Sequence, residues 1–211
     1  MRPMNAATLR QQIAGPAGPL QCAIDTAATP RGVAVLCHPH PQHGGTLDNK
    51  VVQTLARALL HLGYTAVRFN FRGIGSSAGA WDEGRGEIDD AMAVIEAWRQ
   101  PALPLVLAGF SFGAFVASQA ASRLAASGAP AERLVLVGAA VQSFEVASVP
   151  IDTLVIHGEA DDVVPLSAVF DWARPQSLPV TVLPGAGHFF HGQLPVLKQM
   201  ILGAWAWRAA Q

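Results

Sequence analysis

The 211-residue sequence predicts an α/β protein in which helices cover both faces of a mostly parallel sheet. Short runs that are apolar throughout, such as residues 32–38 and 103–109, are typical of strands buried on both faces. Segments with apolar residues at helical spacing alternate with these runs along most of the chain. No repeat, low-complexity segment or linker interrupts the pattern, so we expect a single domain over residues 1–211.

The strands are expected where short apolar runs stand between turn-forming residues. The residues Gly15-Pro16-Ala17-Gly18 divide residues 8–25 into a predicted antiparallel hairpin. The remaining strands are expected at residues 32–38, 64–71, 103–109, 133–140, 152–158 and 180–183.

Helices are expected where apolar residues recur every three or four positions. The first covers residues 52–59, and Gly63 follows it as a C-terminal cap. The others are expected at residues 88–95, 112–126, 166–173 and 197–204. Trp205 and Trp207 directly follow this last helical stretch and are two positions apart, so only one of them can face the core well. We expect the other to make a lid-like contact or an interface contact, such as one in a homodimer.

Composition excludes several function classes. The chain is 51% hydrophobic and 14% charged, so it can bury a large core. A net charge of −1 without a run of like charges argues against binding to nucleic acid or to an anionic membrane surface. Cys22 and Cys37 lack a CxxC spacing and are expected to be buried free thiols in a reducing compartment, which favours a cytoplasmic location.

Two segments bear on membrane targeting. The first residues contain no apolar run, so a secretory signal is not expected. Residues 101–122 carry no charge and are long enough to span a membrane, but Pro104, Gly109 and Gly113 interrupt them. A strand, a turn and a buried helix explain this segment better, and no membrane insertion is expected.

The main chemical signal lies at Gly109-Phe110-Ser111-Phe112-Gly113, which matches G-x-S-x-G. This pattern arises by chance in many chains, where it is only a buried turn. Here it falls where a strand passes directly into a helix, and such an elbow exposes a serine hydroxyl above the edge of the sheet. Small residues two positions before and after the serine allow the strand and the helix to approach closely.

A nucleophilic serine needs a base that is itself oriented by an acid. Asp161 follows the strand that ends near His157, and its spacing from the preceding glycine favours it over Asp162. The alternative is that both aspartates only cap the next helix. His188, in a turn bracketed by glycines, is the expected base, with His191 as its competitor.

Together with three further stretches, His38–Leu59, Gly63–Gly79 and Gly185–Gly192, these motifs resemble the α/β-hydrolase superfamily over essentially the full chain. The likeness is greatest to a small bacterial subgroup of lidless serine hydrolases. The resemblance implies an eight-stranded, mainly parallel sheet and a catalytic triad of Ser111, His188 and Asp161.

The resemblance also implies an oxyanion hole, a pair of backbone N–H groups that bind the developing negative charge. One donor is the N–H of Phe112. The second lies in the loop after the strand at residues 32–38, and there it falls on His40. The sequence has a doubled His-Pro where the commoner pattern is His-Gly, so Gln42 remains the alternative donor.

Two other motifs compete with this interpretation. His38, His40 and His43 are residue types that bind zinc, but prolines separate them and no carboxylate stands at ligand spacing, so no metal is expected. Residues 73–78, Gly-Ile-Gly-Ser-Ser-Ala, fit the dinucleotide fingerprint. That fingerprint must open a helix, whereas the next helix is expected only near Arg85, so no cofactor is expected.

Many α/β-hydrolases insert a helical cap after the sixth strand. Here the ten residues 141–150, VQSFEVASVP, are too short for one, so no cap domain and an open groove are expected. The residues expected to wall the groove and bind substrate are His40, Gln42, Trp81, Phe110, Phe189 and Phe190.

The expected function is therefore a cofactor-independent serine hydrolase of the carboxylesterase type. It would cleave small to medium acyl esters or thioesters, with the acyl substrate and water as its partners. The alternatives are a serine peptidase or amidase that uses the same site, and a non-catalytic binding protein on the hydrolase scaffold.

Overall fold

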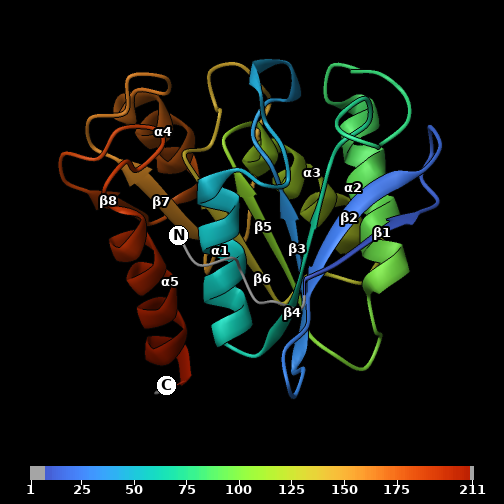
Figure 1. Ribbon diagram of the computed structural model, residues 1–211. Coiled ribbons are helices and arrows are strands. Elements are labelled where there is room, and N and C mark those ends of the chain that lie inside the picture. Colours follow the sequence, from blue (N-terminus) through green and yellow to red (C-terminus); the bar gives the residue numbers. More distant parts are fainter. Residues whose placement is uncertain (1–7, 210–211) are drawn as a thin grey trace.

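A twisted eight-stranded sheet forms the centre of the computed structural model, which describes residues 8–209 of the chain and side chains as far as residue 205 (Figure 1). The strand order is β1-β2-β4-β3-β5-β6-β7-β8. Strand β2 pairs antiparallel with β1 and β4, and every other pairing in this sheet is parallel. The strands span Leu9–Ile13 (β1), Leu20–Asp25 (β2), Gly32–Cys37 (β3), Tyr64–Phe69 (β4), Leu105–Phe110 (β5), Arg133–Val137 (β6), Leu154–Gly158 (β7) and Val180–Leu183 (β8).

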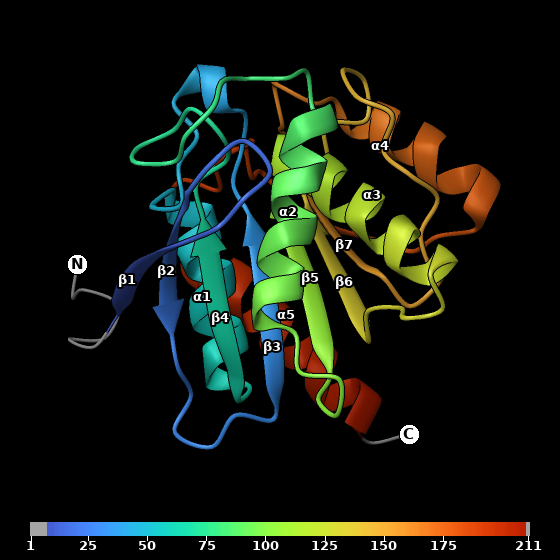
Figure 2. The ribbon, with the colours of Figure 1, turned by 90° about the vertical axis from the view of Figure 1, so that its right-hand side faces the viewer.

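Helices cover both faces of the sheet. Helices α1 and α5 pack together on one face, and Figure 2 looks onto the other face, which α2 and α3 cover. The α-helices span Lys50–His61 (α1), Arg85–Trp98 (α2), Phe112–Ala126 (α3), Leu166–Ala173 (α4) and Leu194–Ala209 (α5). Short 3₁₀ turns stand at Pro41–His43 (η1) and Arg174–Gln176 (η2).

The core is divided by the sheet into two halves, because successive side chains of a strand point to opposite faces. In β3, Ala34 and Leu36 pack beneath α1 and α5, whereas Val33 and Val35 pack beneath α2 and α3. Strands buried on both faces must be apolar at every position, which is why β3 and β5 show no alternation in the sequence.

The predicted fold class is confirmed, including the N-terminal antiparallel hairpin and the absence of a cap between β6 and β7. The uncharged segment at residues 101–122 forms β5, a sharp turn and most of α3. In the described part of the chain, no helix has both the length and the apolarity that a membrane span requires.

The two cysteines are free and buried, as expected. Burial raises the pKa of Cys22 to about 12, and the pKa of Cys37 is raised for the same reason.

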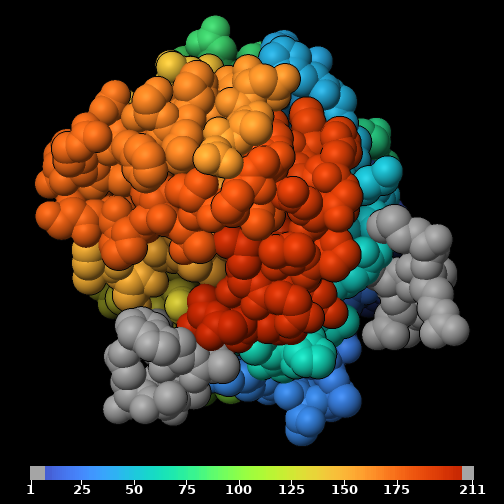
Figure 3. All heavy atoms as spheres, turned by 90° about the vertical axis from the view of Figure 1, so that its left-hand side faces the viewer, coloured from blue at the N-terminus to red at the C-terminus, as the bar shows by residue number. Residues whose placement is uncertain are grey.

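Trp205 packs in the core on the α5 side, while the side chain of Trp207 lies outside the described residues. In Figure 3 the segment around α4 (orange) borders the C-terminal segment that contains α5 (red). The expected homodimer contact stays a prediction.

A buried ion pair fixes the hairpin to the sheet. Arg68 of β4 lies 3.2 Å from the carboxylate of Asp25 on β2, and both side chains are almost fully buried. The guanidinium also donates to the carbonyl of Leu47 at 2.8 Å and contacts the half-exposed Asp48 at 3.2 Å. Arg68 therefore joins β2, β4 and the loop that leads into α1.

The substitution Asp25→Asn should lower the free energy of unfolding by about 3 kcal/mol, because it leaves part of a buried positive charge uncompensated. The matched change Asp48→Asn, on the exposed partner of the same arginine, should cost less than about 1 kcal/mol. Urea unfolding of both variants measures the difference. Equal losses of unfolding free energy would show that the buried pair with Asp25 contributes no more to stability than the exposed pair with Asp48.

Candidate active site

Ser111 stands at the junction of β5 and α3 with φ 57° and ψ −118°, a conformation that L-residues rarely adopt. A Cβ atom at Gly109 would lie 2.1 Å from the carbonyl oxygen of Gly113, and one at Gly113 would lie 2.2 Å from that of Cys37. Both positions must therefore be glycine for the turn to form. The Ser111 N–H donates to the carbonyl of Val137 at 2.9 Å, which ties the elbow to β6.

The structure brings Ser111, His188 and Asp161 into one hydrogen-bonded chain. Nε2 of His188 lies 3.0 Å from the Ser111 hydroxyl, and Nδ1 lies 2.7 Å from the Asp161 carboxylate. The three residues follow β5, β7 and β8, whose carboxyl ends meet at one edge of the sheet (Figure 1). The competing residues lie outside this chain: Asp162 is exposed, and the His191 ring stacks on Phe189.

Three groups hold the carboxylate of Asp161 by hydrogen bonds. One oxygen accepts from the backbone N–H groups of Val163 (2.9 Å) and Val164 (2.7 Å), and the other faces His188. Burial acts to raise the pKa of Asp161, but the hydrogen bonds from His188 and Val164 and the nearby histidines outweigh it. The pKa therefore lies below its ordinary value. An ionised Asp161 keeps a proton on Nδ1 of His188 and leaves Nε2 free to accept one.

The three histidines after β3 do not converge. His38 is fully buried, where Nδ1 donates to the carbonyl of Pro39 (2.7 Å) and Nε2 accepts from the N–H of Phe71 (3.1 Å). His40 and His43 stack with ring centroids 4.4 Å apart. Within residues 8–209, no group of three or more His, Cys, Asp or Glu side chains could hold a metal ion.

The segment that fits the dinucleotide fingerprint is a chain of turns. The Ser77 hydroxyl donates to the carbonyl of Asn70 at 2.8 Å and accepts from the N–H of Gln21 at 2.9 Å, so this segment is fixed against the ends of β2 and β4. Helix α2 begins only at Arg85. The segment therefore does not point its backbone N–H groups along a helix axis, as a pyrophosphate site requires.

Two backbone N–H groups are expected to bind the oxyanion. In the described part of the chain, the N–H groups of Phe112 and His40 donate no hydrogen bond. The Gln42 N–H, the alternative donor, is directed to Nδ1 of His40 at 3.2 Å, which favours His40. The close contact of Gly113 with the His38 carbonyl holds this loop against the first turn of α3.

Three of the expected groove residues lie at the surface around this edge. Trp81 is half-buried and packs on the rings of His40 and Phe112, with centroids 4.6 and 5.2 Å away. Gln42 is exposed. The Phe189 side chain is 45% exposed, and its ring stands edge-on to His188 at 5.1 Å.

The structure corrects the expectation for Phe110 and Phe190, which are both fully buried and cannot wall an open groove. Phe110 ends β5 on the face that α1 and α5 cover, so its ring packs into that half of the core. Phe190 has φ 51°, and its ring packs into the same half of the core while Phe189 stays outside.

Two residues of the site escaped the sequence analysis. Gly138, directly after β6, has φ 54°, and a Cβ atom there would lie 3.2 Å from His188 and from Phe110. His157, near the end of β7, places Nε2 3.3 Å from the carboxylate of Asp161. Both stand at the carboxyl ends of strands beside a proposed site residue, and that position is the signal that could have found them.

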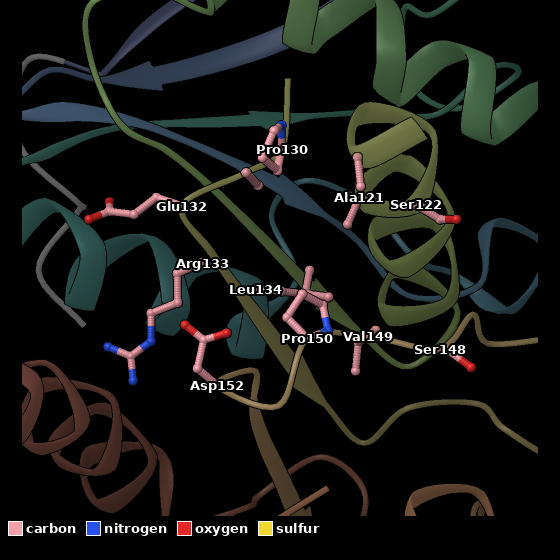
Figure 4. A pocket seen from close by; sticks show the side chains of 12 residues that line it. Ala121, Ser122, Pro130, Glu132, Arg133, Leu134, Ser148, Val149, Pro150 and Asp152 are labelled. Carbon is pink, nitrogen blue, oxygen red and sulfur yellow. The ribbon is translucent and has the colours of Figure 1, made fainter. Parts of the chain in front are cut away.

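Two cavities bear on where a substrate can bind. One of about 320 Å³ lies between the start of α1 and the residues after His188, and is lined by Phe189, His191 and Leu194 among others. Another of about 310 Å³ lies where β6 begins (Figure 4). Ser111 follows the end of β5, at the opposite end of these parallel strands. Its lining includes Pro130, Leu134 and Pro150.

The family model described as "Serine aminopeptidase, S33" matches residues 28–150. An uncharacterized protein of Rickettsia prowazekii, RP471, is 32% identical over 195 residues, which cover 83% of this chain and 79% of that protein.

Two solved structures are similar over nearly their whole lengths. XC6422 from Xanthomonas campestris, a lidless α/β serine hydrolase, is 38% identical with a TM-score of 0.84, covering 95% of this chain and 94% of that one. An α/β serine hydrolase homologue from Coxiella burnetii is 37% identical with a TM-score of 0.79, covering 94% and 98%.

His38 should make stability depend on pH. Burial lowers the pKa of His38 from 6.5 to about 4, so the folded protein binds its proton less readily than the unfolded chain. The stability due to neutral His38 is complete above pH 6.5 and is lost as the pH falls towards 4. Between about pH 7 and pH 5 this loss should be about 2 kcal/mol.

Urea unfolding at these two pH values tests the effect. The variant His38→Gln, which cannot titrate, should lose about 2 kcal/mol less than the wild type over the same interval. Parallel losses in the two proteins would mean that other groups cause the acid sensitivity.

Proposed function

The chain belongs to the α/β-hydrolase family that the serine aminopeptidase S33 model describes and is a serine hydrolase, and from this premise we propose that it is a carboxylesterase. Its substrates are small to medium acyl esters or thioesters. The observation that carries the proposal is the hydrogen-bonded chain from Ser111 through His188 to Asp161 on a strained elbow.

In the first half of the reaction the Ser111 oxygen attacks the acyl carbon while Nε2 of His188 takes its proton. The ionised Asp161 stabilises the imidazolium that forms and keeps the ring in place. The oxyanion accepts hydrogen bonds from the N–H groups of Phe112 and His40, each worth about 2.7–4 kcal/mol in the transition state. His188 then donates the proton to the departing alcohol or thiol, which leaves an acyl-enzyme on Ser111.

In the second half, water attacks the acyl carbon and His188 accepts a proton from it. Collapse of the second tetrahedral intermediate releases the carboxylic acid and returns the proton to Ser111. The short connection between β6 and β7 supports hydrolysis over transfer to another acceptor, because no cap keeps water from the acyl-enzyme.

The proposed substrate contacts are Gln42, Trp81 and Phe189 at the surface of this edge, together with His40, on which Trp81 packs. The exposed Phe189 ring also lines the cavity of about 320 Å³ at the start of α1, which is large enough for a short acyl chain or an aromatic alcohol. A cytoplasmic location remains a prediction.

A peptidase that releases N-terminal residues is the second candidate, because the family model carries the name of a serine aminopeptidase. Cleavage of an aminoacyl p-nitroanilide at a rate comparable to esters would favour it. The third interpretation, a non-catalytic binding protein, requires a site without a reactive serine.

Hydrolysis of p-nitrophenyl esters, from acetate to palmitate, tests the proposal. The wild type should prefer short or medium chains, and Ser111→Ala should reduce turnover by about 10⁴-fold or more, since the variant lacks the nucleophile. Undiminished turnover by Ser111→Ala would refute the assignment of the serine.

The substitution Gly138→Ala should lower kcat by roughly 10-fold, because the added Cβ meets His188 and shifts its ring. It should also cost about 1 kcal/mol of stability, owing to the left-handed backbone. Gly128→Ala is the matched control: Gly128 has φ 76° and open space around it, so it should lose the same stability and keep full activity. Equal activity of the two variants would show that Gly138 does not support His188.

A further inference from the structure

His157 of β7 is fully buried, yet the reaction proposed above does not use it. Its Nε2 lies 2.8 Å from the carbonyl oxygen of Val164. A carbonyl only accepts, so Nε2 carries the proton and donates it. In the described part of the chain Nδ1 has no hydrogen-bond partner. Burial lowers the pKa of His157, so the ring is neutral and has one fixed tautomer.

The hydrogen bond of His157 closes the turn that holds Asp161. The Val164 N–H donates to one carboxylate oxygen of Asp161, and the Val164 carbonyl accepts from His157. The same Nε2 lies 3.3 Å from the other carboxylate oxygen, which is the oxygen that faces His188. His157 therefore acts on Asp161 in two ways. Its hydrogen bond to Val164 holds the turn that carries Asp161, and the dipole of its N–H group lies close to the carboxylate.

A hydrocarbon side chain would fill this part of the core without leaving a buried nitrogen unpaired. An unsatisfied buried polar atom costs about 1–3 kcal/mol, so a role in packing alone does not account for the imidazole. Its Nε2–H is the one feature that an apolar side chain of the same volume lacks. The titratable groups that face this ring are Asp161 and, through it, His188.

We propose that His157 is a positioning residue for the catalytic carboxylate: its Nε2–H fixes the turn at residues 161–164 and holds Asp161 in line with His188. The inference rests on the proposed function, because it gives Asp161 its catalytic role. His157 itself touches neither the nucleophile nor, in this arrangement, the substrate.

Two substitutions separate the hydrogen bond from the volume of the side chain. Gln at position 157 carries an amide N–H at about the distance of Nε2, whereas Leu fills the space without a donor. His157→Leu should lower kcat for a p-nitrophenyl ester by roughly 10- to 100-fold with KM unchanged, because Asp161 loses its alignment. His157→Gln should stay within about threefold of the wild type, since it restores the donor.

Thr153→Val is the matched control. Thr153 directly precedes β7, is buried, and has a hydroxyl that no described group pairs, so its loss removes a buried polar atom far from Asp161. This variant should keep the wild-type kcat. Where His157→Leu fails to fold, His157→Asn takes its place, because its amide is too short to reach Val164 and should behave as the donor-free variant does.

A readout that does not depend on turnover is the downfield proton resonance of Nδ1–H in His188, which reports its hydrogen bond to Asp161. The resonance should persist in His157→Gln and move upfield or vanish in His157→Leu. If the wild type cleaves no ester, the proposed function fails and this resonance alone decides the role of His157. Full kcat and an unchanged resonance in His157→Leu, or equal losses in the Leu and Gln variants, would overturn the proposal.

Discussion

The close approach of the first turn of α3 to β3 and β5 is the constraint on which the site depends. It is possible only because Gly109 and Gly113 have no side chains to collide with the backbone carbonyls of Gly113 and Cys37. This contact forces Ser111 into its strained conformation and lifts its hydroxyl above the sheet. It also brings the loop after β3 beside α3, where the His40 ring packs on Phe112 with centroids 5.3 Å apart. The conformation of Ser111 and the position of the loop after β3 thus follow from one packing contact.

The fixed tautomers of three buried histidines complete this arrangement. Carbonyl oxygens accept the proton of His38 at Nδ1 and that of His157 at Nε2, while the Asp161 carboxylate accepts that of His188 at Nδ1. Each ring therefore has one orientation and one assigned donor. For His188 this leaves Nε2 directed at Ser111, as a general base requires. Burial disfavours the charged forms of His38 and His157, so these two rings stay neutral beside the site.

The order of elements and the G-x-S-x-G elbow were predictable from the sequence, because both are local: strand burial shows as uninterrupted apolar runs, and the elbow as glycines on either side of Ser111. The direction of the aromatic side chains was not. Phe189 and Phe190 are adjacent and chemically identical, yet only the ring of Phe190, which has a positive φ, is buried. Gly138 and His157 were missed for a related reason: their roles depend on contacts across the sheet with His188 and Asp161, which no local pattern encodes.

The rate at which a fluorophosphonate labels the protein, followed by intact mass and peptide mapping, tests the account most directly, because it depends on the nucleophile and its activation but not on the natural substrate. A single adduct on Ser111 is expected, with labelling that is slow in Asp161→Asn and unchanged in Asp162→Asn. An adduct on another residue, or equal rates in the two aspartate variants, would contradict the assignment of the Ser111–His188–Asp161 chain as the catalytic unit.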